Sequence, residues 1–183
     1  RAAAASLAAT FGGTKGVAIS GGGAISTNQI LNRTNAYIDG SKVSNAADVD
    51  LNAANEATIT AIVGAVSIAL GGGGTTGVGA SIGFSVVANR VGWYDESKSD
   101  DAGISLSQVQ AYINDSDIAT TGDLRLDADA NSKIDALALA GSAAVGAGGT
   151  AGVGLSGAGV STQNKIATEA IKPVFFSSKK NAI

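Results

Sequence analysis

The chain repeats itself, which restricts it to folds that place similar units side by side. The tripeptide Ala36-Tyr37-Ile38 returns as Ala111-Tyr112-Ile113, and the two copies then run in step without a gap. Their offset is about 75 residues, with roughly 20 identities over about 56 positions. A Gly-Gly-Thr-Xaa-Gly motif marks three corresponding points and begins at Gly12, Gly73 and Gly148. Such a repeat predicts an array in which each unit packs on the next.

The copies divide the chain into unequal parts. The first two Gly-Gly-Thr-Xaa-Gly motifs lie about 61 residues apart, so the second repeat carries about 14 additional residues. We expect a partial repeat over 3–35, a repeat over 36–110 with an insertion within 92–110, and a partial repeat over 111–171. Residues 1–171 would then form one repeat region and residues 172–183 a C-terminal cap or tail. Because the chain begins and ends inside repeats, we expect it to be a piece of a longer array.

Two successive segments of each repeat alternate with a period of two residues, which is typical of β-strands. In both segments one face carries only small residues, and in the middle copy these are Ala65, Ser67, Ala69, Gly77, Gly79 and Ser81. The alternate faces are apolar, as at Val66 and Ile68. A face restricted to Gly, Ala and Ser predicts that another part of the chain packs closely against it.

An Ala-rich stretch, 136–140, has an α-helical alternative, because Ala is the strongest helix former. Its aligned partner, 61–65, contains Gly64 and β-branched residues, so we expect both to be strands. Residues 36–55 should form short strands joined by turns, with Asp39-Gly40 at one turn. Within them, Val49 and Leu51 should point inward.

The architecture that fits these patterns is an all-β, parallel β-solenoid. We expect about 20 residues per winding, so that three windings make one repeat of about 61 residues. Asn28, Asn89 and Asn164 would then share a face without lying on adjacent rungs. The alternative is that the two small-faced strands form antiparallel, glycine-rich hairpins that project from a shorter solenoid.

The composition excludes several function classes. Without Cys or His, the chain cannot build a zinc finger, a disulfide scaffold, a thiol nucleophile or a Ser-His-Asp triad. A net charge of −3 with scattered Lys and Arg argues against a nucleic-acid surface. No apolar run is long enough for a membrane-spanning helix, and the residues after Arg1 lack the signal-peptide pattern. We therefore expect that the chain is not an enzyme and holds no resident cofactor.

The insertion holds an aromatic pair among carboxylates, unlike anything else in the chain. This candidate contact loop consists of Trp93, Tyr94, Asp95, Glu96, Asp100 and Asp101. An exposed aromatic pair beside carboxylates suits glycan or protein binding. The alternative is that the indole packs over a solenoid edge and anchors the loop. The carboxylates are also of the type that binds calcium, although Asp on alternating strand positions is more often a solvated face.

The C-terminal segment differs from the repeat. Phe175 and Phe176 follow Pro173, and Lys179 and Lys180 come next. Because the ends of a solenoid expose strand edges and apolar rungs, we expect this segment to cap the C-terminal end.

The succession AYIDGSKV, ADVDLNA and ATITAIVGAVSIALGGGGTTGVGASIGFSVVANRV resembles the long repeats of very large secreted bacterial surface proteins. These are the leukotoxin-like and filamentous-haemagglutinin-like adhesins, and the likeness covers nearly all of residues 3–171. The resemblance implies a right-handed β-helix, a secreted or cell-surface location, and no catalytic residues. The insertion and the C-terminal segment depart from the repeat.

Two functions follow as expectations. The first is a structural repeat module that acts as a rigid spacer and interaction surface in an adhesin or matrix protein. The second is a self-assembling subunit of an extracellular filament or layer, joined end to end through open strands. Expected partners are neighbouring repeats of the same chain, further copies of it, and host or matrix glycans or proteins.

Overall fold

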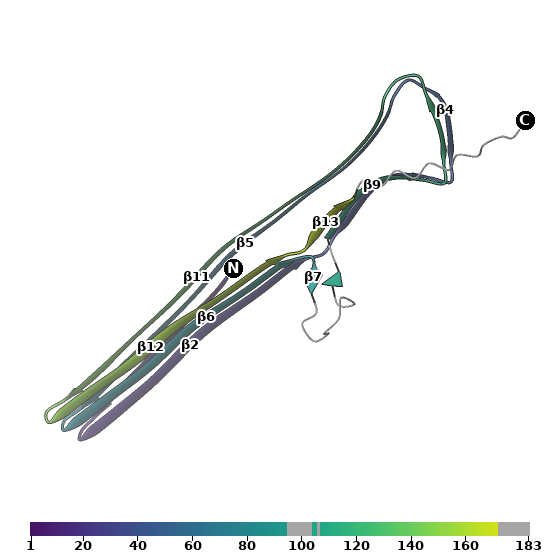
Figure 1. Cartoon of the computed structure of the whole chain (residues 1–183). Coiled ribbons are helices and arrows are strands. Elements are labelled where there is room, and N and C mark those ends of the chain that lie inside the picture. The colour runs from purple at the N-terminus through teal and green to yellow at the C-terminus, as the bar shows by residue number, and fades with distance from the viewer. Residues whose placement is uncertain (95–103, 106, 172–183) are drawn as a thin grey trace, which may run out of the picture. The chain divides into compact units, whose positions relative to one another are not determined.

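The computed structural model describes residues 1–94, 104–105 and 107–171, and every regular element in these ranges is a β-strand (Figure 1). The strands are β1 (Ala2–Gly12), β2 (Lys15–Ile30), β3 (Arg33–Asp39), β4 (Lys42–Ala46), β5 (Val49–Gly73), β6 (Thr76–Val91), β7 (Trp93–Tyr94), β8 (Ile104–Ser105), β9 (Ser107–Asn114), β10 (Asp117–Thr120), β11 (Leu124–Gly148), β12 (Ala151–Ile166) and β13 (Thr168–Ile171). The stretch 136–140 lies within β11, so the strand interpretation of the Ala-rich segment is confirmed.

Corresponding strands of successive repeats pair side by side. β1 pairs with β5 in parallel and in unbroken register, from Ala2 opposite Val63 to Gly12 opposite Gly73. The hydrogen-bonded strand orders are β1-β5-β11, β12-β6-β2, β13-β9-β3 and β10-β4. These stacked parallel strands confirm the predicted parallel β-solenoid.

The expected size of a winding was wrong. Residues that are hydrogen-bonded neighbours on adjacent strands are 61 or 75 positions apart in sequence, as Asn28 and Asn89 or Asn89 and Asn164 are. One repeat therefore makes one turn of the solenoid rather than three. The physical reason is strand length, because β5 and β11 each continue for 25 residues where several short strands were expected.

The chain forms two compact units, and every turn contributes to both. Unit 1 consists of Arg1–Asn28, Ile59–Asn89 and Ile134–Asn164. It contains β1 and the C-terminal parts of β5 and β11 in one sheet, which we call the β5 sheet. It also contains most of β2, β6 and β12 in a second sheet, the β6 sheet. The chain passes from one sheet to the other at each Gly-Gly-Thr-Xaa-Gly motif.

This reversal corrects the hairpin alternative. The strands on either side of the motif do run back on each other, but they belong to different sheets and pair with their counterparts in the next turn. The turns themselves are also bonded in a row, since the Thr75 N–H donates to the Thr14 carbonyl at 2.9 Å and the Thr150 N–H to the Thr75 carbonyl at 2.9 Å. Each reversal is therefore an arch and not a hydrogen-bonded hairpin.

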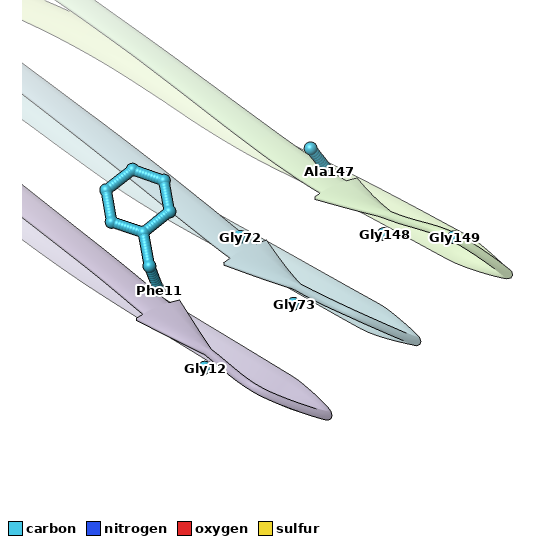
Figure 2. A pocket seen from close by; sticks show the side chains of 7 residues that line it. All are labelled: Phe11, Gly12, Gly72, Gly73, Ala147, Gly148 and Gly149. Atoms are coloured by element: carbon cyan, nitrogen blue, oxygen red, sulfur yellow. The ribbon is translucent and has the colours of Figure 1, made fainter.

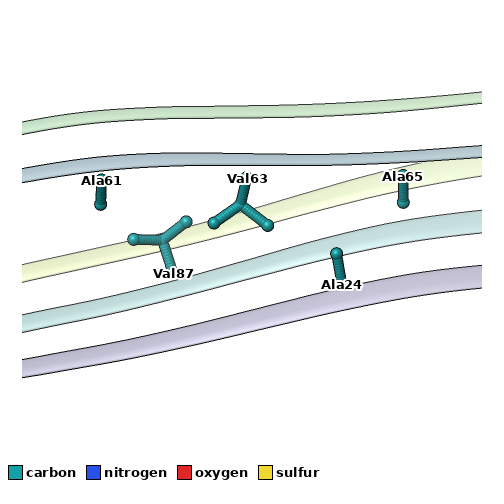
Figure 3. Close-up of a cluster of buried hydrophobic side chains, with 5 residues drawn as sticks. All are labelled: Ala24, Ala61, Val63, Ala65 and Val87. Carbon is teal, nitrogen blue, oxygen red and sulfur yellow. The ribbon is translucent and has the colours of Figure 1, made fainter. Parts of the chain in front are cut away.

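The interior of unit 1 is narrow and built from small side chains. Figure 3 shows Ala61, Val63 and Ala65 of β5 pointing toward Ala24 of β2 and Val87 of β6, and all five are at most 6% exposed. Side chains of this size fill only a thin layer, so the two sheets approach closely.

Unit 2 consists of Gln29–Thr58, Arg90–Lys133 and Lys165–Ile183. Its core is formed by Ala53, Val109, Ala111 and Ala128, with half-buried Leu51 against it. The predicted turn at Asp39-Gly40 is confirmed, because Gly40 has a positive φ angle of 56°. Asp115, which corresponds to Gly40 in the next copy, has a φ angle of 43°. Val49 is half-buried like Leu51, whereas Asp48 and Asp50 are exposed, as the alternation predicts.

The expected insertion begins after the β6 strand. The Gly92 N–H still donates to the Ile30 carbonyl at 2.8 Å, and Gln108 already pairs with Arg33. The additional residues of the longer turn therefore lie between Gly92 and Ser107.

Candidate functional site

The small-residue faces named above lie inside unit 1, where backbone approaches them from across the interior. Ser67 and Ala69 are 0% exposed, and Ser81 is 1% exposed. A Cβ atom placed on Gly79 would lie 2.5 Å from the carbonyl oxygen of Val145 and 3.1 Å from that of Ala69. Only glycine fits such a position without displacing backbone. The face is small because strands of the opposite sheet occupy the space where side chains would be.

A row of serine hydroxyls crosses this interior. Ser81 Oγ donates to Ser67 Oγ at 2.7 Å, and Ser67 Oγ donates to Ser20 Oγ at 3.0 Å. Ser6 and Ser20 share a further bond at 2.5 Å between their hydroxyls. The row joins the two sheets, and it gives each buried hydroxyl a partner, as burial requires.

A second ladder is made of asparagine amides. Asn28 Nδ2 donates to Asn89 Oδ1 at 2.8 Å, and Asn89 Nδ2 donates to Asn164 Oδ1 at 2.8 Å. The expectation that these three residues do not lie on adjacent rungs was wrong, because one repeat makes one turn. Their separations of 61 and 75 residues match the repeat offsets, which is the signal that identifies them as neighbours.

In unit 2, side chains of β3 also pair with the corresponding side chains of β9 in the next repeat. The rings of Tyr37 and Tyr112 stack with centroids 5.3 Å apart and planes at 10°. At the C-terminal ends of the same two strands, Asn114 Nδ2 donates to Asp39 Oδ1 at 2.8 Å. These contacts fix the register of β3 against β9 in addition to the backbone bonds.

We predict that the tyrosine stack stabilises the pairing of β3 with β9. A double-mutant cycle with Tyr37→Ala and Tyr112→Ala should give a coupling free energy of about 0.5–1.5 kcal/mol beyond the individual losses. The unmodified chain, the two single variants and the double variant are unfolded in urea, and the unfolding is monitored by far-ultraviolet circular dichroism. Strictly additive losses would contradict a direct interaction between the rings.

The outer faces of unit 1 are apolar on both sheets. Their large side chains with more than half of the surface exposed include Leu7, Phe11, Val66 and Leu139 on the β5 sheet, and Val17, Ile19, Ile25, Ile82, Val153 and Leu155 on the β6 sheet. Sequence alternation places these side chains together on one face of each strand. It does not show that the face lies outside, because within unit 1 both faces of these strands are almost free of charge.

Two phenylalanine rings lie over glycines of the neighbouring strand on these outer faces. A Cβ on Gly72 would be 2.6 Å from the Phe11 ring, and a Cβ on Gly23 would also overlap the ring of Phe84. Figure 2 shows Phe11 next to Gly72 at the hollow beside the arches. The rings cover backbone that glycine would otherwise leave bare.

Of the candidate contact loop, the structure describes only the backbone of its first two residues, Trp93 and Tyr94. β7, which contains Trp93 and Tyr94, pairs with β8 in an antiparallel manner, with Trp93 opposite Ser105 and Tyr94 opposite Ile104. Asp95, Glu96, Asp100 and Asp101 lie outside the described residues, as does the expected cap over 172–183. Glycan, protein or calcium binding by this loop stays a prediction.

The carboxylates that the structure describes do not form a cluster that could bind a metal ion. Asp48 accepts a 2.8 Å bond from the Asp123 N–H at a turn, and Asp129 is exposed. In residues 1–94, 104–105 and 107–171, no group of three or more Asp or Glu could hold a metal ion. Nor does this part of the chain contain a helix that could cross a membrane. No protein-family model, curated protein or solved structure matches the chain.

Proposed function

We propose that the chain is a structural repeat module of a secreted or cell-surface bacterial adhesin or matrix protein, acting as a rigid spacer and interaction surface. The observation that carries this proposal is the unbroken parallel register between turns, from Ala2 opposite Val63 to Gly12 opposite Gly73. Each turn is held to the next by long strands in both sheets of unit 1 and by strands of unit 2. Separating two turns breaks many bonds together, which makes such a stack stiff.

Side-chain ladders support the same proposal. The amides donate in one direction, from Asn28 to Asn89 to Asn164, so a further turn with Asn at the same position would continue the ladder at either end. The partners we propose first are therefore neighbouring repeats of the same chain. The buried polar side chains that the structure describes are Ser and Asn, and most of those in unit 1 are engaged in these rows.

End-to-end assembly of separate copies is the second candidate. β1 and β11 lie at opposite edges of the β5 sheet, and β2 and β12 lie at opposite edges of the β6 sheet. Such edges are templates for pairing with another chain. If this function holds, electron micrographs of the purified chain will show particles that lengthen along the stacking direction as concentration rises.

The location is tested on intact cells that produce the protein. An antibody against unit 2 should label the cells without permeabilisation, and protease added outside should remove the label. The matched control is a cytoplasmic protein, which must stay unlabelled and uncut in the same cells. Labelling that appears only after permeabilisation would refute a secreted or cell-surface role.

A further inference from the structure

We propose that the outer faces of unit 1 bind unit 1 of a second copy of this chain, sheet against sheet. This inference concerns the flat faces and not the strand edges, and it does not depend on the proposed spacer function. Three observations carry it: the near absence of charge, the exposure of large apolar side chains, and outer glycines at which a Cβ atom would contact none of the described residues.

Unit 1 is almost free of charge. Of the 12 Lys and Arg and 15 Asp and Glu residues of the chain, only Arg1, Lys15 and Asp135 fall in it. Large side chains nevertheless face outward, since Leu7, Ile19 and Leu155 are 72%, 75% and 71% exposed. Apolar patches of this extent are rare on surfaces that stay in water, and they mark sites of association.

The inner glycines of unit 1 have a clear reason. A Cβ on Gly22 would lie 2.8 Å from the carbonyl oxygen of Val66, and Gly79 meets backbone in the same way. Glycine weakens a strand, so its presence within one usually marks the close approach of another backbone or a ligand. Inside unit 1 the approaching group is the opposite sheet.

The outer glycines have no such reason in the part of the chain that the structure describes. A Cβ placed on any of five outer-face positions would meet nothing within 4 Å, and these are Gly21, Gly64, Gly141, Gly157 and Gly159. By the argument that explains the inner glycines, the group that approaches these positions is none of the described residues, 1–94, 104–105 and 107–171.

Large exposed side chains lie beside the outer glycines, and each of these glycines leaves a hollow in the face of the sheet. The repeat offsets place Gly21 and Gly157 on either side of Ile82, which is 64% exposed. On the β5 sheet, the same offsets place Gly64 beside Leu139, which is 58% exposed. A row of knobs and hollows is what one apolar sheet needs to interdigitate with another at a spacing of about 10 Å. In a second copy, the same large side chains could pack into the glycine positions of the first.

A lipid bilayer fits these observations less well than a second copy. Fluid acyl chains need no hollows of fixed position. Sheet stacking covers the apolar faces and leaves the edges at the side.

The size of the faces predicts reversible association. Three strands about 4.8 Å apart and about 11 residues long give a face of roughly 500 Å². A stable interface buries about 800 Å² on each partner, so one face alone falls short of it. We therefore expect an equilibrium that depends on concentration.

The test fills the hollows without changing the polarity of the faces. The variant carries Gly21→Val, Gly64→Val, Gly141→Val and Gly157→Val together, and its self-association is compared with that of the unmodified chain by sedimentation velocity over a hundredfold range of concentration. We expect the dissociation constant to rise at least tenfold while the melting temperature, measured in dilute solution, stays equal or increases. Charged replacements, Ile82→Glu with Leu139→Glu, should weaken association at least as much.

Three outcomes would overturn the proposal. The first is an unmodified chain that stays monomeric at every concentration. The second is a hollow-filled variant that associates as tightly as the unmodified chain, which would indicate unspecific apolar contact or pairing through the edges alone. The third is flotation of the unmodified chain with phosphatidylcholine vesicles combined with no self-association in their absence, which would assign the faces to lipid.

Discussion

Gly79→Val is expected to abolish the cooperative fold of unit 1, with a loss of more than about 3 kcal/mol in the free energy of unfolding. The first atom of any side chain at this position would lie 2.5 Å from the Val145 carbonyl oxygen, which belongs to a long strand bonded to its neighbours. Relief requires the two sheets to move apart, and that movement opens the serine row as well. Urea unfolding followed by far-ultraviolet circular dichroism measures the loss.

Gly21→Val is the matched control, because it makes the same chemical change in the same sheet on the outer face. A Cβ there meets nothing within 4 Å. Valine also has a higher strand propensity than glycine, so the free energy of unfolding should rise by up to about 1 kcal/mol. Equal losses at Gly79 and Gly21 would show that close packing across the interior is not what excludes side chains.

Asn89→Leu is expected to lower the free energy of unfolding by about 2–4 kcal/mol. Asn89 is 0% exposed, and it accepts a bond from Asn28 while donating one to Asn164. Leucine has the same number of side-chain heavy atoms and the same branching at Cγ, but it leaves both partner amides without the bonds they make in the ladder. The cost is therefore that of broken polar contacts in a buried row rather than of a cavity.

Asn164→Leu provides the comparison within the same ladder. Asn164 is exposed at the last turn, and the ladder gives it one bond, from Asn89. Water can replace that bond, so the loss should stay below about 1 kcal/mol. The two variants are compared by their thermal melting midpoints at equal concentration. If Asn164→Leu destabilises as strongly as Asn89→Leu, burial of the amide row is not the source of its stability.

The parts of the fold that could be predicted follow from recurrence. Because Ala65, Ser67 and Ala69 have small counterparts in every copy, the sequence indicates one strand face under a steric limit. The parallel arrangement follows from repetition, since equal segments stack most simply in the same direction. The turn at Asp39-Gly40 follows from residue types that tolerate positive φ angles.

The length of a turn could not be predicted, because the usual breaks in a strand pattern are misleading here. Gly64 lies in the middle of β5, a strand of 25 residues, although glycine normally marks its end. Gly64 pairs with Ala3 in the unbroken register of β1 and β5, so this glycine does not mark a turn. The separation of Asn28 from Asn89 was the better guide to the turn, since the Asn89 amide would otherwise be buried without its partners in the ladder.

The exposed position of the bulky face was also beyond sequence reasoning. Alternation sorts Val66 and Ile68 onto one side of β5 and Ser67 onto the other. Ordinary hydrophobic patterning would place the larger side chains inside. The structure places Ser67 inside, because a narrow gap admits only side chains of its size.

Because one repeat closes one full turn, the stack of strands can grow or shrink along its axis only in whole turns. A deletion or duplication of 61 or 75 residues would leave every surviving ladder with a partner of the same kind, whereas a change of another length within a strand would shift the rows out of line. Genes that encode such arrays can therefore gain or lose complete turns by recombination between copies without loss of folding. Natural variants are expected to differ by these integral steps.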